Sequence, residues 1–136
     1  MSAGYSQTPL ARKLGIKPGY KVLLYQAPDH YFELFADLPA ELEFLESGVE
    51  EGVDFIHLFC TEMQDLEAVA DVHKSFLKKT GLMWVSWPKG KSKIPTDLKR
   101  EPIRDHLLSI GLVDVKVAAV DEDWSGLKFV YRVKDR

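Results

Sequence analysis

The run VDFIHLFC at residues 53–60 constrains the fold more than any other part of the chain. This continuous apolar run is short for a helix and fits a strand that is covered on both faces. Such strands occur in parallel sheets that carry helices on either side. The run therefore predicts an α/β domain built around a mostly parallel sheet.

Further strand signals lie on both sides of this run. Residues 21–25 (KVLLY), 42–45 and 82–87 (LMWVSW) form apolar runs of strand length. Residues 113–120 and 127–133 alternate apolar and polar side chains, and Ser125-Gly126 supplies turn chemistry between them. We expect a mixed sheet of about six strands that ends in an antiparallel hairpin.

Four helical segments separate these strands. Pro9 and Gly15 bracket a short helix within the leading segment, residues 1–16. Asp29 can begin a second helix, which Pro39 would end. A capping box at Thr61 and Gln64 starts a helix running to Gly81, and Pro102 lies in the first turn of a helix ending at Ile110.

The length and composition fit a single domain over residues 1–136, with no linker that would divide the chain. The formal net charge is −3, and no helix face is predominantly basic, so we expect no binding to nucleic acid. No apolar run approaches the roughly 20 residues of a membrane-spanning helix. The lone Cys60 excludes an internal disulfide, and no secretory signal is visible, so we expect a cytoplasmic protein outside the membrane.

Three phrases resemble the S-adenosylmethionine-dependent class I methyltransferases: LGIKPGYKVLL at 14–24, FLKKTGLMWVSWP at 76–88 and HLLSIGLVDVKVAAV at 106–120. The resemblance covers nearly the whole chain from Leu14 onward. It implies a three-layer, Rossmann-like domain whose last strand inserts antiparallel. It also implies a cofactor loop after the first strand and an acidic, ribose-holding residue after the second, which Glu46 could match.

The chain departs from this family in two ways. The family has a glycine-rich turn after the first strand, whereas this chain has Gln26, Ala27, Pro28 and Asp29. Pro28 has no amide proton, Ala27 carries a Cβ, and Asp29 would occupy the helix end itself, so we expect no cofactor here and no S-adenosylmethionine. The turn between residues 45 and 53 is also too short for a crossover helix. One strand-helix unit of the family is therefore missing.

A second resemblance is to a family of short bacterial proteins defined as a domain of unknown function. It lies in TPLARKLGI at 8–16 and VDEDWSGLKF at 120–129. This resemblance implies no activity.

The basic loop after residues 82–87 is a candidate ligand site. Lys89 and Lys91 follow the carboxyl end of that predicted strand, where open α/β sheets bind ligands, and Trp87 could line the same crevice. With Gln26, Asp29 and Glu46, these residues form our candidate ligand set. The GKS within the loop lacks the earlier glycine of a nucleotide-binding loop, so the alternative is a solvated surface loop.

Cys60 and His57 are the candidate catalytic residues. Cys60 precedes a predicted helix, whose dipole would lower the thiol pKa and favour the nucleophilic thiolate. Its alternative is a small buried apolar residue. His57 and His73 could face each other, but no third ligand is near in sequence, so we expect no metal site.

The closing hairpin offers a possible interaction surface. Asp121, Asp123 and Trp124 cluster at its turn, where carboxylates and an aromatic ring suit a cationic ligand or a protein partner. The alternative is a charged turn anchored by packing of Trp124 onto the sheet.

These observations favour a noncatalytic, methyltransferase-like binding or protein-interaction domain rather than an enzyme. The alternative is a small enzyme or a degenerate S-adenosylmethionine-binding methyltransferase. The partner would be a small molecule or a protein, and the sequence leaves the oligomeric state open.

Overall fold

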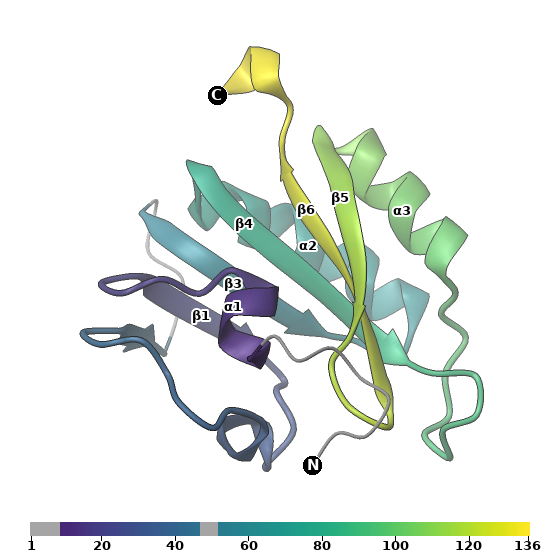
Figure 1. Cartoon of the computed structure of the whole chain (residues 1–136). Helices are drawn as coiled ribbons and strands as arrows, with labels where there is room; N and C mark the ends of the chain where they lie inside the picture. The colour runs from purple at the N-terminus through teal and green to yellow at the C-terminus, as the bar shows by residue number, and fades with distance from the viewer. Residues whose placement is uncertain (1–8, 47–51) are drawn as a thin grey trace.

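Six strands form one mixed sheet, in the order β2-β1-β3-β4-β6-β5, in the computed structural model, which describes residues 9–46 and 52–136 (Figure 1). The strands are β1 (Lys21–Tyr25), β2 (Glu43–Leu45), β3 (Val53–Phe59), β4 (Leu77–Pro88), β5 (Leu112–Ala119) and β6 (Trp124–Tyr131). The first four run parallel to one another, whereas β6 runs antiparallel to both β4 and β5. The predicted mixed sheet with a closing antiparallel hairpin is confirmed.

Helical elements cover both faces of the sheet (Figure 1). One face carries α2 (Met63–Phe76) and α3 (Arg100–Ser109), and the other carries α1 (Leu10–Leu14) and the 3-10 helix η1 (Tyr31–Leu34); a last turn, η2 (Val133–Asp135), ends the chain. Strand β3 sends Ile56 and Leu58 into the first core and Phe55 and Phe59 into the second. These two cores confirm the predicted three-layer architecture.

The start of α2 differs from the predicted capping box. The helix begins at Met63, and no side chain of its N-cap residue, Glu62, bonds to the helix. Instead, Asp97 Oδ1 accepts the backbone N–H of Met63 at 2.8 Å, from a loop 34 residues further along the chain. The same loop is held in place because the Thr96 hydroxyl donates to the Thr61 carbonyl oxygen at 2.6 Å. A tertiary contact therefore replaces the local cap.

Substituting this cap should weaken the whole domain. We expect Asp97→Ala to lower the free energy of unfolding by about 1 kcal/mol, the usual contribution of an N-terminal cap. Urea denaturation would measure the change. Asp97→Asn should recover most of the loss, because an amide oxygen also accepts the bond. Asp105→Ala, at an exposed position on α3, is the matched control, and an equal loss in that variant would contradict the role of Asp97.

The predicted end of α2 at Gly81 is wrong. The helix ends at Phe76, and β4 starts at the next residue. A Cβ built on Gly81 would lie 2.9 Å from the Asp54 carbonyl oxygen and 2.8 Å from Leu77 Cδ1. Gly81 therefore serves the close approach of β4 to β3, at the place where their register shifts, and does not stop a helix.

The helix predicted after Asp29 is reduced to the single 3-10 turn η1. Its anchors are Tyr31 and Phe35, which are both buried in the second core. The backbone becomes extended at Phe35, where the helical turn ends. In contrast, the leading helix ends at a left-handed Gly15, as expected from the sequence.

The turn of the closing hairpin also lies elsewhere than predicted. Ser125 and Gly126 belong to β6, and the Asp121 carboxylate organises the turn by accepting the N–H groups of Asp123 and Trp124 at 2.8 and 2.9 Å. A Cβ on Gly126 would approach the Trp84 ring to 2.9 Å. Glycine is therefore needed here for packing against Trp84 and not for a turn.

Candidate functional site

The carboxyl ends of β1, β3 and β4 meet at one edge of the sheet. These strands are neighbours and run parallel, so the loops that follow Tyr25, Phe59 and Pro88 leave from the same side. Ligands of open α/β sheets bind at this edge, outside the carboxyl ends of the strands. The candidate ligand residues lie on these loops or just beyond β2, except Trp87, which lies within β4.

Gln26 opens the loop after β1 with an unusual backbone. Its φ is 53°, in the left-handed region that a side chain disfavours by roughly 1–2 kcal/mol. The loop then closes into η1 through a 2.9 Å bond from the N–H of Tyr31 to the Pro28 carbonyl oxygen. Gln26 and Asp29 are both exposed. The loop after β1 therefore begins with a left-handed residue that is not glycine.

Glu46 lies one residue beyond the end of β2, with its side chain exposed. The parallel register pairs Leu45 with Leu23, so Glu46 comes level with the last residues of β1. Its carboxylate is therefore at the same edge of the sheet as the Gln26 loop. The structure brings together two positions that the sequence separates by 20 residues.

Tyr25, Cys60 and Asp65 form a cluster that the sequence did not reveal. The Tyr25 hydroxyl donates to Asp65 Oδ1 at 2.8 Å, and burial, followed by this neighbouring carboxylate, raises the pKa of Tyr25 to about 12. Tyr25 ends β1 and Asp65 lies in the first turn of α2. No sequence signal connects residues so far apart; only their shared edge of the sheet does.

The expected activation of Cys60 is wrong in direction. The side chain is completely buried, and burial, together with the charge of Asp65, raises the thiol pKa to about 12. Desolvation therefore outweighs any stabilisation of the thiolate by the N-terminus of α2. Cys60 is a neutral thiol in the core near pH 7.

His57 lies inside the second core with both ring nitrogens bonded. Nδ1 contacts the Tyr31 hydroxyl at 3.0 Å and Nε2 contacts the Ser86 hydroxyl at 2.7 Å. The side chain is completely buried, and this burial lowers its pKa to about 3. The imidazole is therefore neutral near pH 7 and packs against Phe59.

His73 does not face His57. It lies on α2, on the other side of the sheet, where its Nδ1 bonds the Val69 carbonyl oxygen at 2.8 Å and its ring packs edge-on against Tyr25. The histidine pair considered in the sequence therefore does not form. In the described part of the chain, no three His, Cys, Asp or Glu side chains gather as a metal-binding group would require.

The basic loop after β4 is fastened to the closing hairpin. Asp123 accepts the Lys89 N–H through its carbonyl oxygen and the Ser92 hydroxyl through its carboxylate, each at 2.8 Å. A hollow lies between the two segments, lined by Lys89, Lys91, Ser92, Lys93, Ile94, Glu122 and Asp123. Trp87 is buried in the first core and does not line it. Since β1 and β3 lie between β4 and β2, the structure separates these lysines from Glu46.

The hairpin candidates point mostly inward. Trp124 is 7% exposed, and its ring meets Phe59 edge-on with centroids 5.0 Å apart. Asp121 accepts a bond from His30 at 2.9 Å besides the two backbone bonds of the turn. This arrangement matches the alternative we gave for the hairpin, a charged turn anchored by Trp124. Because the Trp124 ring is buried, it is not exposed for contact with a partner, as the predicted interaction surface would require.

No protein-family model matches the sequence, and no curated protein matches it. The assignment to a bacterial family of unknown function therefore stays a prediction. In the residues that the structure describes, no helix has the length and apolar character to cross a membrane.

Solved structures do match the fold. A structure described as a SAM dependent methyltransferase from Aquifex aeolicus is 14% identical, with a TM-score of 0.57, over 88% of this chain and 86% of the other. The DhpI-SAH complex is 11% identical, with a TM-score of 0.62, over 92% and 83%. Fibrillarin from Aeropyrum pernix, described with natively bound S-adenosyl-L-methionine, is 15% identical, with a TM-score of 0.59, over 85% and 68%. The chain therefore has the Rossmann-like fold of S-adenosylmethionine-dependent methyltransferases.

These matches overturn our expectation that the domain has no cofactor. We had excluded S-adenosylmethionine because the loop after the first strand lacks glycine, yet structures of this fold are described with that molecule or with SAH bound. That expectation rested on the residues of a single loop, whereas the likeness to these structures comes from the arrangement of the six strands and of the helices that cover them. A noncatalytic role, our preferred reading, is not shown either.

Proposed function

We propose that this domain binds S-adenosylmethionine at the carboxyl ends of β1, β2 and β3, as a methyltransferase that lacks one strand-helix unit of the family. The observation that carries the proposal is the pairing of the left-handed turn at Gln26 with an exposed carboxylate, Glu46, at the same edge. The methyltransferase-like fold supports it.

The residues at this edge have chemistry that suits the molecule. Glu46 is free to accept hydrogen bonds from the hydroxyl groups of a ribose, and the Gln26 side-chain amide both donates and accepts bonds. When bound, S-adenosylmethionine supplies a methyl group on a sulfonium for transfer. Tyr25 is held by Asp65 beside this edge, so its hydroxyl is kept protonated and fixed in orientation.

Thermal unfolding with and without the ligand tests the proposal directly. A ligand at 100 times its Kd stabilises the folded state by about 2.7 kcal/mol. For a domain of this size, we expect the Tm to rise by roughly 10 °C with saturating S-adenosylmethionine or S-adenosylhomocysteine. Adenosine at the same concentration should give a smaller rise. An unchanged Tm at millimolar concentrations of both ligands would reject the proposal.

Variants at the edge locate the site. Glu46→Gln removes the charge from the proposed ribose acceptor and should weaken binding by roughly tenfold or more, since bonds to charged groups contribute about 1.5–3 kcal/mol. Glu67→Gln, at an exposed position on α2, is the matched control and should bind as the parent protein does. Equal binding by both variants would show that any bound ligand occupies another place.

A further inference from the structure

Two phenylalanine rings are exposed together at one edge of the sheet. Phe32 on η1 is 50% exposed and Phe44 on β2 is 42% exposed. Their ring centroids are 5.2 Å apart, with the planes nearly perpendicular at 84°, so they form one surface. We name it the Phe32/Phe44 patch. Single exposed apolar side chains are ordinary, but two aromatic rings in mutual contact form a surface suited to a partner.

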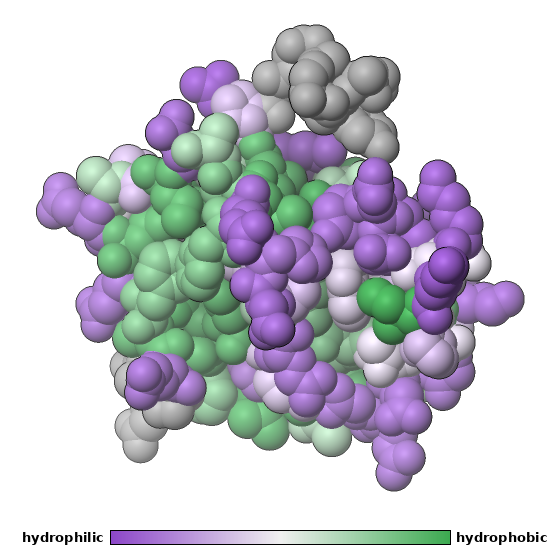
Figure 2. Space-filling model, turned by 90° about the horizontal axis from the view of Figure 1, so that it is seen from below, coloured by the Kyte–Doolittle hydropathy of each residue, from purple (hydrophilic) through white to green (hydrophobic). Residues whose placement is uncertain are grey.

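The patch lies beside an open strand edge. Strand β2 is the last strand of the sheet on this side, and among the described residues only β1 pairs with it. The side of the molecule that holds β1 and η1 carries a broad hydrophobic area on the left of Figure 2. An open edge offers backbone groups to an added strand, whose alternate side chains would then meet the neighbouring surface. The Phe32/Phe44 patch and the β2 edge are thus placed for one extended segment.

Charge is distributed very unevenly along the chain. Residues 22–73 contain 13 of the 21 acidic residues and none of the 18 lysines and arginines. This segment builds β1 apart from its first residue, Lys21, together with η1, β2, β3 and most of α2. The stretch of chain that contains both Phe32 and Phe44 therefore carries a large excess of acidic residues, although the net charge of the whole chain is only −3.

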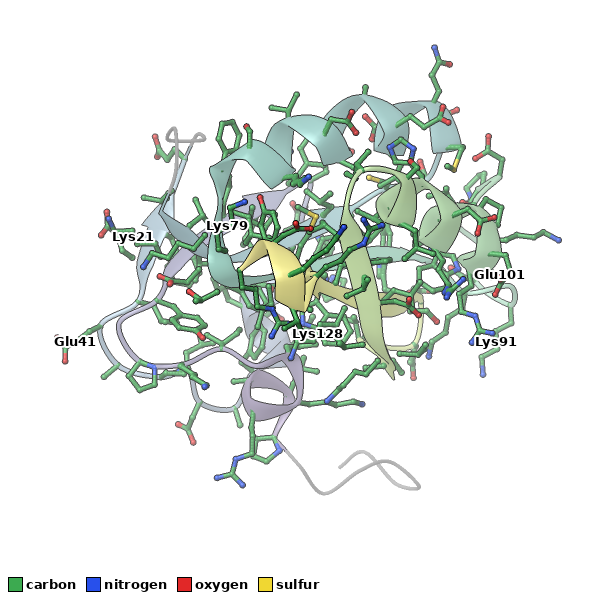
Figure 3. All side chains as sticks on the ribbon, turned by 90° about the horizontal axis from the view of Figure 1, so that it is seen from above. Lys21, Glu41, Lys79, Lys91, Glu101 and Lys128 are labelled. Atoms are coloured by element: carbon green, nitrogen blue, oxygen red, sulfur yellow. The ribbon has the colours of Figure 1, made fainter. Side chains whose placement is uncertain are left out.

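Acidic side chains close to Phe32 and Phe44 in the sequence are exposed. Glu33 follows Phe32, and Glu41 precedes β2. Within the ranges 9–46 and 52–136, neither is part of an ion pair. Glu41 stands at the outer left in Figure 3, on the opposite side of the molecule from Lys91. Lys21 of β1 lies opposite Glu43 of β2 in the strand register.

The charge decides what can cover this surface. A second copy related by a twofold axis at β2 would bring the same acidic residues together, and like charges across paired strands are destabilising. A cationic segment would instead be attracted to these acidic side chains. We propose that the Phe32/Phe44 patch and the β2 edge bind an extended, lysine- or arginine-rich segment of another protein, in which cationic and apolar residues alternate. This proposal does not depend on binding of S-adenosylmethionine.

A synthetic peptide tests it. The probe is a fluorescein-labelled peptide of five Lys-Val repeats, with binding to the full chain followed by fluorescence anisotropy. We expect a Kd in the micromolar range that weakens as salt rises, because exposed charges are screened. Phe32→Ser should weaken binding about tenfold, and Glu33→Lys should weaken it and reduce its salt dependence. Both positions are exposed, so circular dichroism should show unchanged folding.

Controls separate the surface from charge alone. Val72→Ser and Glu67→Lys make the same kinds of change on the outer side of α2, where Val72 is 51% exposed, and should leave the Kd unchanged. A peptide of Lys-Pro repeats carries the same charge but lacks the N–H groups of alternate residues, so it should bind more weakly.

Four outcomes would overturn the proposal. These are no binding of the Lys-Val peptide at 1 mM, equal binding by the Phe32→Ser variant, equal binding of the two peptides, and self-association of the protein that Phe32→Ser abolishes. The last outcome would show that a second copy covers the patch.

Discussion

Trp84→Ala should lower the free energy of unfolding by about 4 kcal/mol, within the range found when a buried tryptophan or phenylalanine is cut to alanine. Trp84 is completely buried on β4, and its indole N–H donates to the Leu14 carbonyl oxygen at 2.7 Å. That bond ties the end of α1 to the middle of the sheet. The variant therefore loses packing and also leaves a buried carbonyl without its donor. Urea denaturation, with near-ultraviolet circular dichroism as a second probe, would measure the loss.

Two controls separate the contributions of Trp84. Trp84→Phe keeps an aromatic ring but removes the N–H donor, so we expect a smaller loss of roughly 1–3 kcal/mol from the unpaired carbonyl and the reduced volume. Trp87→Phe changes a tryptophan of the other core, and α1 should stay docked in that variant. A loss below about 1 kcal/mol for Trp84→Ala would contradict the role assigned to this residue.

Acidification should destabilise the domain through His57. Its pKa is about 3 in the folded protein and about 6.5 when unfolded, so below pH 6.5 the unfolded chain binds a proton that the folded chain does not. Stability is therefore full above pH 6.5 and falls as the pH drops toward 3. Between pH 7 and pH 5, the expected loss from this residue alone is about 2 kcal/mol. Urea denaturation at the two pH values would show it.

A variant and a direct titration isolate this effect. His57→Gln keeps a polar side chain between Tyr31 and Ser86 but cannot titrate, so its stability should depend on pH by about 2 kcal/mol less than that of the parent protein. Burial also lowers the pKa of His73, which adds to the loss in both proteins and cancels in the comparison. NMR titration of the His57 ring provides the second measurement. Protonation of the folded protein near pH 6 would refute the prediction.

The candidate site was only partly visible in the sequence. Glu46 is a candidate because an acidic residue after the second strand is part of the family resemblance, and its role stays a prediction. The left-handed backbone of Gln26 could not be predicted from the sequence, because the identity of a non-glycine residue does not indicate that conformation and the surrounding fold imposes it. Tyr25 and Asp65 were missed altogether, since their bond joins residues 40 positions apart.

The Phe32/Phe44 patch could likewise be predicted only in part from the sequence. The lack of lysine and arginine from residue 22 to residue 73 can be counted in the sequence. The contact between Phe32 and Phe44 beside an open strand edge cannot be predicted in this way, because it depends on how η1 packs against β2 in the folded chain. The number of charges in a segment can therefore be read from the sequence, whereas the residues that share a surface are known only from the folded structure.

The mixed sheet, the helical layers on its two faces and the closing hairpin could be predicted from the amino-acid sequence. Hydrophobic periodicity is a local property, and each apolar run must bury its own surface wherever it lies in the fold. Tertiary structure decided where elements end and which polar groups meet: Asp97 caps α2, Gly81 allows β4 to approach β3, and burial makes Cys60 a neutral thiol. These outcomes depend on neighbours distant in sequence, because hydrogen bonds, close backbone contacts and desolvation are set only when the chain has packed.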